Sequence, residues 1–127
     1  MVMLYHYTSS DGCFGIISEG FIRSSKDTTR DAMLGQGVYL TSPPPWTDGK
    51  KIVMNNWDGQ SESVFLDKLD HINYFIAFDS RYLHFVRKAS GPRDVWMVPY
   101  DIDLDKVPHS IHMRGSNVTV AESLGYL

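Results

Sequence analysis

The chain has 127 residues, 43% of them hydrophobic and 21% charged, which is the composition of a globular protein long enough to bury one core. Its net charge of −3, with no basic cluster, argues against the broad basic surface that non-specific nucleic-acid binding needs. The single cysteine excludes an internal disulfide and no apolar run reaches about 18 residues, so we expect one domain over residues 1–127, in a reducing compartment, without a signal peptide or membrane span.

The first elements are a strand and a helix. Residues 3–8, MLYHYT, alternate so that Leu4, His6 and Thr8 share one strand face. Ser9 or Ser10 can cap a helix that runs to about Glu19 and stops at Gly20. Its expected inward residues are Cys13, Phe14, Ile16 and Ile17. Residues 21–25, FIRSS, predict a short second strand, and the polar residues 25–35 predict a loop, with one helical turn as the alternative for part of it.

Residues 34–45, LGQGVYLTSPPP, combine two glycines, an apolar strand and a proline stop. Glycines at 35 and 37 free the backbone, residues 38–41 favour strand, and prolines at 43–45 end it. Alternation places Tyr39 on the face opposite its two apolar neighbours. Bare backbone beside an aromatic ring suits a flat ligand. The alternative is a hairpin with a core tyrosine.

The second half of the chain is richer in strands than in helices. We expect a helix near residues 50–57, a loop at 58–62, a helical turn near 64–69, and a buried central strand at 71–79. Residues 81–86 fit helix or strand, 90–94 a loop, 95–100 a strand limited by Pro99, and 111–120 an edge hairpin. The fold class is therefore α+β, with a mostly antiparallel or mixed sheet.

Few side chains stand out as chemical candidates. His6 is either a hydrogen-bonding group for a ligand or a core histidine, and Arg30 is either a diphosphate anchor or half of a surface pair with Asp31. Asp79 and Asp94 each stand at a strand end, where a carboxylate can reach a site or bond the local backbone. The histidines lack metal-ligand spacing, and GQGVYL is not a dinucleotide fingerprint, because it leads into a strand and ends in leucine.

Three motifs in order resemble the ADP-ribosyltransferase superfamily of the diphtheria-toxin and poly(ADP-ribose) polymerase type. They are YHYTS at 5–9, GIISEG at 15–20, and TRDA at 29–32 followed by GQGVY at 35–39. The resemblance is greatest to its small toxin-type branch, named for a His-Tyr-Asp triad, and covers about residues 4–100. It implies a split antiparallel or mixed β-sheet core with few short helices.

The resemblance also implies the site residues. His6 matches the histidine that bonds the adenosine ribose, and Tyr39 matches the tyrosine that stacks on nicotinamide. Asp94 falls at the third catalytic position, with Asp79 as its competitor. The implied NAD-binding residues are Tyr7, Thr8, Ser9, Arg30, Gly37 and Thr41. Related enzymes have a glycine where Thr8 and Ser9 follow the histidine. No metal is implied.

The implied function is that of an NAD-dependent mono-ADP-ribosyltransferase, a toxin or effector that transfers ADP-ribose to a macromolecule, expected to be a protein. A carboxylate stabilises the positive charge that builds on the ribose, and a tyrosine face holds the cationic nicotinamide ring. Aspartate is one methylene shorter than glutamate, which leaves NAD hydrolysis as an alternative. A third hypothesis is that the chain is a catalytically inactive module that binds NAD, ADP-ribose or a protein. We expect a monomer that is cytoplasmic or delivered into a target cytosol.

Overall fold

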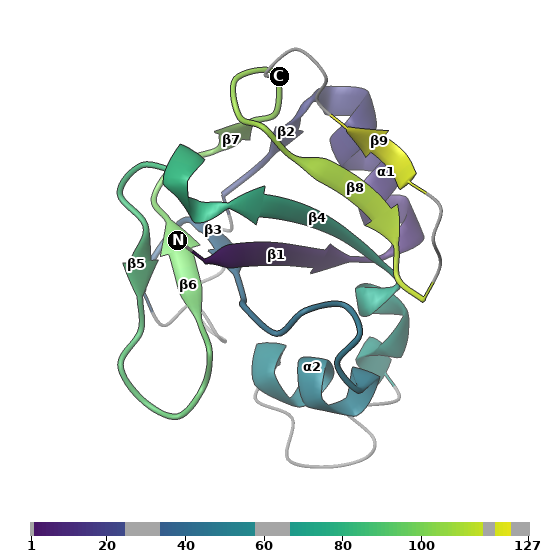
Figure 1. The fold of residues 1–127 in the computed structure, drawn as a ribbon, viewed down its shortest axis with the longest axis vertical. Helices are drawn as coiled ribbons and strands as arrows, with labels where there is room; N and C mark the ends of the chain where they lie inside the picture. The colour runs from purple at the N-terminus through teal and green to yellow at the C-terminus, as the bar shows by residue number, and fades with distance from the viewer. Residues whose placement is uncertain (1, 25–33, 58–66, 116–118, 123–127) are drawn as a thin grey trace.

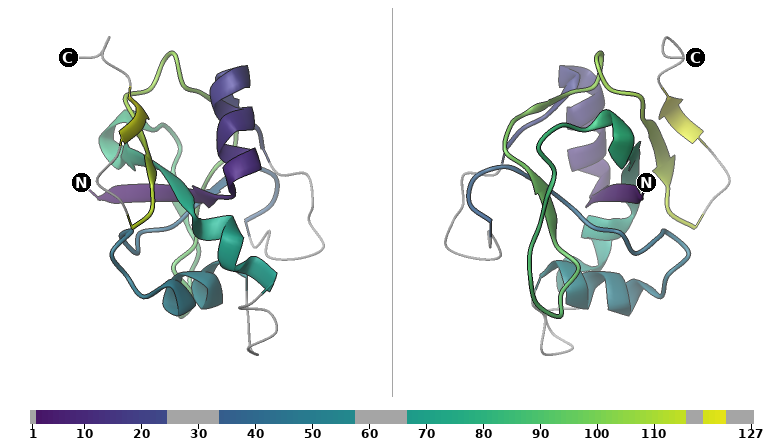
Figure 2. Two further views of the ribbon diagram at one scale, coloured as in Figure 1. Left: turned by 90° about the vertical axis from the view of Figure 1, so that its right-hand side faces the viewer. Right: turned by 60° about the vertical axis from the view of Figure 1, so that its left-hand side comes forward.

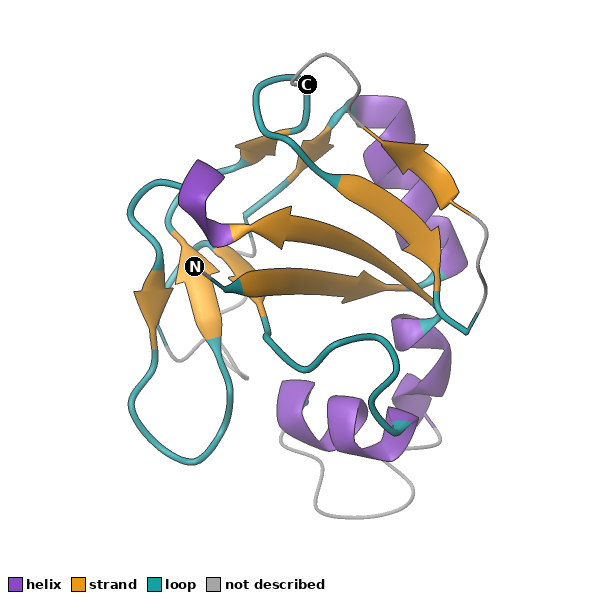
Figure 3. Cartoon of the chain, in the orientation of Figure 1, coloured by secondary structure: helices purple, strands orange, loops and turns teal. Residues whose placement is uncertain are grey.

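The computed structural model describes residues 2–24, 34–57, 67–115 and 119–122, which form short strands and a few short helices (Figures 1 and 3). The strands are β1 (Met3–Thr8), β2 (Phe21–Ile22), β3 (Val38–Leu40), β4 (Tyr74–Asp79), β5 (Arg87–Lys88), β6 (Trp96–Val98), β7 (Ile102–Asp103), β8 (Ser110–Met113) and β9 (Thr119–Glu122). The helices are α1 (Ser10–Glu19) and α2 (Gly49–Asn56), with 3-10 turns η1 (Leu69–Ile72) and η2 (Ser80–Tyr82). The α+β class is confirmed. None of the helices in this described part is long and apolar enough to cross a membrane.

The largest sheet has the strand order β1-β4-β8-β9, and its neighbouring strands are antiparallel. Its centre is β4, whose residues 75–78 are all buried, as the apolar run predicted. The strand begins at Tyr74 rather than His71, because residues 69–72 form η1. The predicted C-terminal hairpin is confirmed by the pairing of β8 with β9.

A second sheet, β3-β6-β5, meets the first one beside β1. Tyr5 and Thr41 form an isolated antiparallel bridge there, with backbone N–H to O distances of 2.8 and 3.0 Å in the two directions. A third pair, β2 with β7, lies at the top of Figure 1. The sheet is thus split, as the family resemblance implied, although β7 has no counterpart among the elements that we predicted.

The two faces of β1 pack against different partners. Leu4 lies in a core with Cys13 of α1 and with the buried side chains of β3. Tyr5 and Tyr7 point the other way, into a second cluster with Ile52 of α2. The side view in Figure 2 shows α1 beside the sheet and α2 beneath it. The predicted alternation of β1 is therefore confirmed.

Helix α1 begins and ends where its caps predict. The Ser9 hydroxyl accepts a bond from the Gly12 N–H at 3.1 Å, and Gly20 has a φ of 81°. The predicted inward face is partly wrong, because Phe14 is 50% exposed and Ile17 is 37% exposed. Cys13 is the buried residue of the helix. Phe14, the next residue, lies about 100° around the helix axis from Cys13 and so points away from the core.

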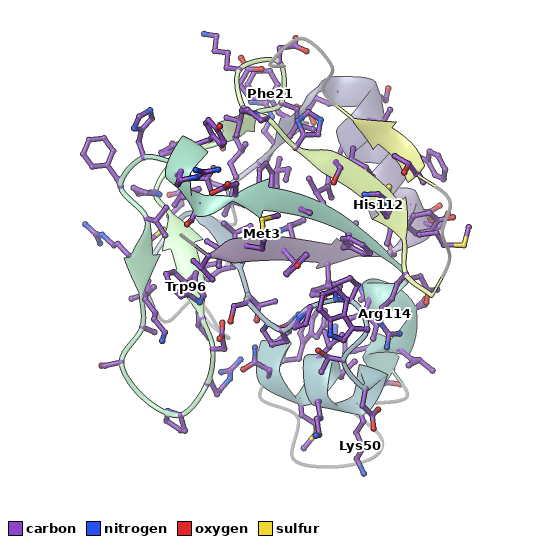
Figure 4. The ribbon with its side chains drawn as sticks, in the orientation of Figure 1. Met3, Phe21, Lys50, Trp96, His112 and Arg114 are labelled. Atoms are coloured by element: carbon purple, nitrogen blue, oxygen red, sulfur yellow. The ribbon has the colours of Figure 1, made fainter. Side chains whose placement is uncertain are left out.

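The last strands are tied to the loop that follows β3. Arg114, just after β8, donates from Nε to the Pro45 carbonyl at 3.1 Å and from Nη2 to the Thr47 carbonyl at 2.9 Å. Figure 4 shows Arg114 at the end of β8, above α2. Residues 81–86 adopt η2 and then an irregular segment rather than a continuous helix or strand. The predicted loop at 58–62, and residues 25–33 of the predicted loop at 25–35, lie outside the described residues.

Candidate functional site

His6 is half-buried on β1 and reaches across to β3. Its Nδ1 lies 3.0 Å from the Tyr39 carbonyl oxygen, which can only accept, so Nδ1 carries the proton. Burial lowers the pKa of His6 below its ordinary value of 6.5, and the bond to the carbonyl opposes that shift. The imidazole is therefore neutral near pH 7, and its Nε2 is a hydrogen-bond acceptor.

Tyr39 is half-buried, on the face of β3 opposite Val38 and Leu40, as predicted. Its hydroxyl donates to the Gly35 carbonyl and accepts from the Leu34 N–H at 3.1 Å. Gly35 has a φ of 90°, a conformation that favours glycine, which lets the chain turn back over the phenol. The turn before β3 thus fixes the Tyr39 ring.

Gly37 does not clear space for a ligand in the way that we predicted. It is buried, and a Cβ there would lie 2.3 Å from the Met97 Sδ and 2.5 Å from the Val98 carbonyl oxygen. The missing side chain therefore makes room for the neighbouring strand β6. The prediction that both glycines clear space for a ligand is therefore wrong at Gly37, where Met97 and Val98 already fill that space. A Cβ on Gly35 would meet nothing within 4 Å.

The Asp94 carboxylate is half-buried and held at the end of β3 by several donors. Its Oδ1 accepts from the Ser42 N–H at 2.9 Å and from the Trp96 Nε1 at 2.8 Å. Its Oδ2 accepts from the Ser42 hydroxyl. An ionised carboxylate has about four acceptor positions, so Oδ2 keeps one for a further donor. The carboxylate is therefore held in a fixed place by Ser42 and Trp96.

The β3–β6 ladder fixes where Tyr39 lies relative to Trp96, the indole donor to Asp94. Tyr39 pairs with Met97 and Leu40 pairs with Trp96, so the Tyr39 ring and the Trp96 indole project to opposite faces of the β3–β6 ladder. Asp94 itself precedes the ladder: its Oδ1 accepts from the indole and also lies 3.5 Å from the Thr41 hydroxyl oxygen, so the register does not assign its carboxylate to either face. The structure brings His6 to the Tyr39 backbone and Asp94 to the end of the same strand. Among the described hydrogen bonds, none joins the side chains of His6, Tyr39 and Asp94 to one another. A cleft shared by the three therefore stays a prediction.

Most of the residues predicted to bind NAD have structural roles in the fold. Tyr7 is buried on the other face of β1 from His6 and donates its hydroxyl to the Pro43 carbonyl at 2.7 Å, so it does not line the surface beside His6. Ser9 caps α1, and the Thr8 hydroxyl lies against Gly12, where an added Cβ would be 2.1 Å away. Thr41 does adjoin Asp94, and its hydroxyl donates to the Asp94 carbonyl at 3.1 Å. Arg30 lies outside the described residues.

Asp79, the competing carboxylate, caps η2 as a local interaction. Its Oδ1 accepts from the Arg81 N–H at 3.0 Å, and its Oδ2 accepts from the Arg81 Nη2 at 2.7 Å. These bonds hold the pKa of the Asp79 carboxyl below its usual value. Of the two alternatives for Asp79, the bond to the local backbone is the one that the structure shows.

The sequence reasoning missed three contributors to the site: Ser42, Asn55 and Trp96. The first and third donate to the Asp94 carboxylate, while Asn55, in the last turn of α2, bonds the Asp94 backbone. Trp96 had a local signal, since it shares a strand face with Asp94 two residues away. Within the described residues, no group of three or more His, Cys, Asp or Glu side chains could hold a metal ion.

Comparison with known protein families gives one match. A family model described as "HYD1 signature containing ADP-ribosyltransferase" matches residues 4–106. That range contains β1, β3 and the Asp94 segment. No curated protein and no solved structure matches the chain.

Proposed function

Because the chain belongs to this toxin-type family of ADP-ribosyltransferases with the HYD1 signature, we propose that it cleaves the nicotinamide–ribose bond of NAD and transfers the ADP-ribose to a macromolecular acceptor, expected to be a protein. The observation that carries the proposal is the Asp94 carboxylate, held by Ser42 and Trp96 at the end of the strand that bears Tyr39. A fixed negative charge is what the positive charge developing on a ribose requires.

His6 binds the sugar in this proposal. With its Nδ1–H donated to the Tyr39 carbonyl, Nε2 has a lone pair for a ribose hydroxyl. The same bond ties the imidazole to β3, so the sugar and the nicotinamide are positioned by one pair of strands. Burial supports the role, because it disfavours the protonated ring, which could not accept.

Tyr39 supports the nicotinamide. Its hydroxyl is occupied by residues 34 and 35, which leaves the ring face, rather than the polar end, as the ligand-binding part. The pyridinium ring of NAD is cationic, and an aromatic face attracts a cation by about 0.5–2 kcal/mol.

Asp94 stabilises the transition state. The C–N bond breaks, nicotinamide leaves with its electron pair, and positive charge develops on the ribose. The acceptor forms a bond to the anomeric carbon and gives up its proton to the carboxylate or to water. The remaining acceptor position of Oδ2 is available to a ribose hydroxyl during this step.

NAD hydrolysis on the same site is the second candidate. The observation that favours it is again Asp94. Its short side chain accepts hydrogen bonds from the Ser42 hydroxyl and the Trp96 indole, so its carboxylate extends less far toward an incoming acceptor. Water needs no such reach.

The test is incubation with NAD alone and then with cell lysate, with nicotinamide release and labelled ADP-ribose transfer as readouts. Release with labelled macromolecules supports the transferase, and release without them supports the hydrolase. The control is Tyr39→Ala, which should lose nicotinamide release yet remain folded, because Tyr39 is half-buried on the face opposite Val38 and Leu40. Neither release nor transfer by the parent protein would refute both enzymatic functions. A parent-like rate in Tyr39→Ala would refute the role of that ring.

A further inference from the structure

The last turn of α2 makes an unusual contact with the Asp94 segment. The Asn55 Oδ1 accepts from the Asp94 N–H at 2.7 Å, and the Asn55 Nδ2 donates to the Asp94 carbonyl at 2.8 Å. One side-chain amide thus satisfies both backbone polar groups of one residue, as the N–H and C=O of a residue on a neighbouring antiparallel strand would.

The same amide also bonds β3. The Asn55 Nδ2 donates to the Thr41 hydroxyl oxygen at 2.9 Å, and that hydroxyl in turn donates to the Asp94 carbonyl at 3.1 Å. Thr41 is buried and forms the bridge to Tyr5. Asn55 therefore links three separate pieces of chain, namely α2, the end of β3 and the Asp94 segment, at the junction of the two sheets.

Asp94 needs such a support, because it precedes β6 and lies outside the regular ladder. The segment before it is a loop in which Gly91 has a φ of 118°. The carboxylate is oriented by Ser42 and Trp96, but its backbone N–H is held by Asn55. Asp94, whose side chain is proposed to act on the ribose, is thus held both at its backbone and at its carboxylate.

We propose that Asn55 is a positioning residue that sets where the Asp94 carboxylate stands relative to the ribose of NAD. This inference rests on the proposed function. Catalytic groups must be held within a fraction of an ångström, and a displacement of about 1 Å can cost about 10²-fold in rate. Asn55 touches neither substrate nor reacting atoms in this role, and it acts through Asp94.

The test is Asn55→Asp, which is nearly isosteric and keeps an oxygen for the Asp94 N–H, but loses the donor to the Asp94 carbonyl and to Thr41. We expect kcat for nicotinamide release to fall by about 10–100-fold, with KM for NAD changed by less than about threefold. The matched control is Asn73→Asp, the same change at an exposed asparagine after η1, which should leave both constants near those of the parent.

A double-mutant cycle separates positioning from mere folding. In an Asp94→Asn background the Asn55→Asp change should lower kcat by no more than about twofold, because the group that it positions is already neutral. An equal loss in both backgrounds would overturn the inference and assign Asn55 to stability alone. If Asn55→Asp does not fold, Thr41→Val removes two bonds of the same network: the one from Asn55 to the Thr41 hydroxyl and the one from that hydroxyl to the Asp94 carbonyl. It should lower kcat in the parent but not in the Asp94→Asn background.

The two proposals fail in different ways. If the parent protein releases no nicotinamide from NAD, the proposed function is wrong, and the role of Asn55 is wrong with it. If the parent protein is active and folded Asn55→Asp matches it in kcat, only the positioning role is refuted.

Discussion

Replacing Asp94 by asparagine removes the negative charge at the end of β3 and keeps the shape of the side chain. The amide oxygen can still accept from the Ser42 N–H and the Trp96 Nε1, which now lie 2.9 and 2.8 Å from Oδ1. The new amide nitrogen can donate to the Ser42 hydroxyl, whose oxygen also accepts. These hydrogen bonds are still made in the variant, but they are no longer charge-assisted. We therefore expect the free energy of unfolding to fall by about 1 kcal/mol.

The effect on catalysis should be much larger. A unit charge about 4 Å from the charge developing on the ribose contributes about 4 kcal/mol at an effective dielectric constant of about 20. Removing one preorganised stabilising group typically costs about 10²–10³ in rate. We therefore expect Asp94→Asn to lower nicotinamide release by about 10²–10³-fold at saturating NAD, while NAD binding weakens much less.

The assay compares Asp94→Asn with Asp79→Asn at equal concentrations of folded protein. Asp79 caps η2 and bonds Arg81, so its amide variant should retain the rate of the parent protein. Quantitative release of nicotinamide at saturating NAD, with thermal melts of each variant, completes the measurement. If Asp79→Asn abolishes release and Asp94→Asn does not, the third catalytic residue is Asp79 and the assignment argued above is wrong.

Three further predictions concern stability. Gly37→Ala should destabilise the fold by about 1–3 kcal/mol in urea unfolding, because its Cβ would stand 2.3 Å from the Met97 Sδ; parent-like stability would show that β6 can move aside. The pKa of His6 is lowered in the folded protein, so its contribution to stability is complete above its ordinary value of 6.5 and is lost as the pH falls below it. Melting temperatures of the parent should accordingly drop between about pH 7 and 5 more than those of His6→Asn, which does not titrate, and equal drops would contradict the assigned burial effect. Tyr7→Phe removes the bond to the Pro43 carbonyl and should cost about 1 kcal/mol; unchanged stability with weakened NAD binding would instead make Tyr7 a ligand contact.

The elements predicted well from the sequence are those whose signals are local. The alternation of β1, the apolar run of β4 and the two caps of α1 each lie within about ten consecutive residues, and each is confirmed. The strands β5 and β7 have two residues each and carry no pattern of their own, so their pairing depends on the rest of the fold.

The site was predicted less completely because its contacts join distant residues. His6 and Tyr39 were identified from motifs, but the bond between the His6 ring and the Tyr39 carbonyl follows from the meeting of two strands. Asn55 lies near a helix end with no sequence feature of its own, and its partner Asp94 is 39 residues away. Gly37 shows the same limit, since a glycine that admits a ligand and one that admits a methionine look alike in the sequence.

The pairing of β8 with β4 affects how this protein can be shortened. The family match ends at residue 106, yet β8 begins at Ser110 and covers the second edge of β4 from Tyr74 to Ala77. A recombinant fragment cut at the limit of the match would leave that hydrophobic central strand with an open edge, ready to recruit another chain. It would also lose the buried Ile111 and the hydrogen bonds from Arg114 to the loop after β3. Aggregation of such a fragment would then report a missing edge strand and would say nothing about the chemistry of the site.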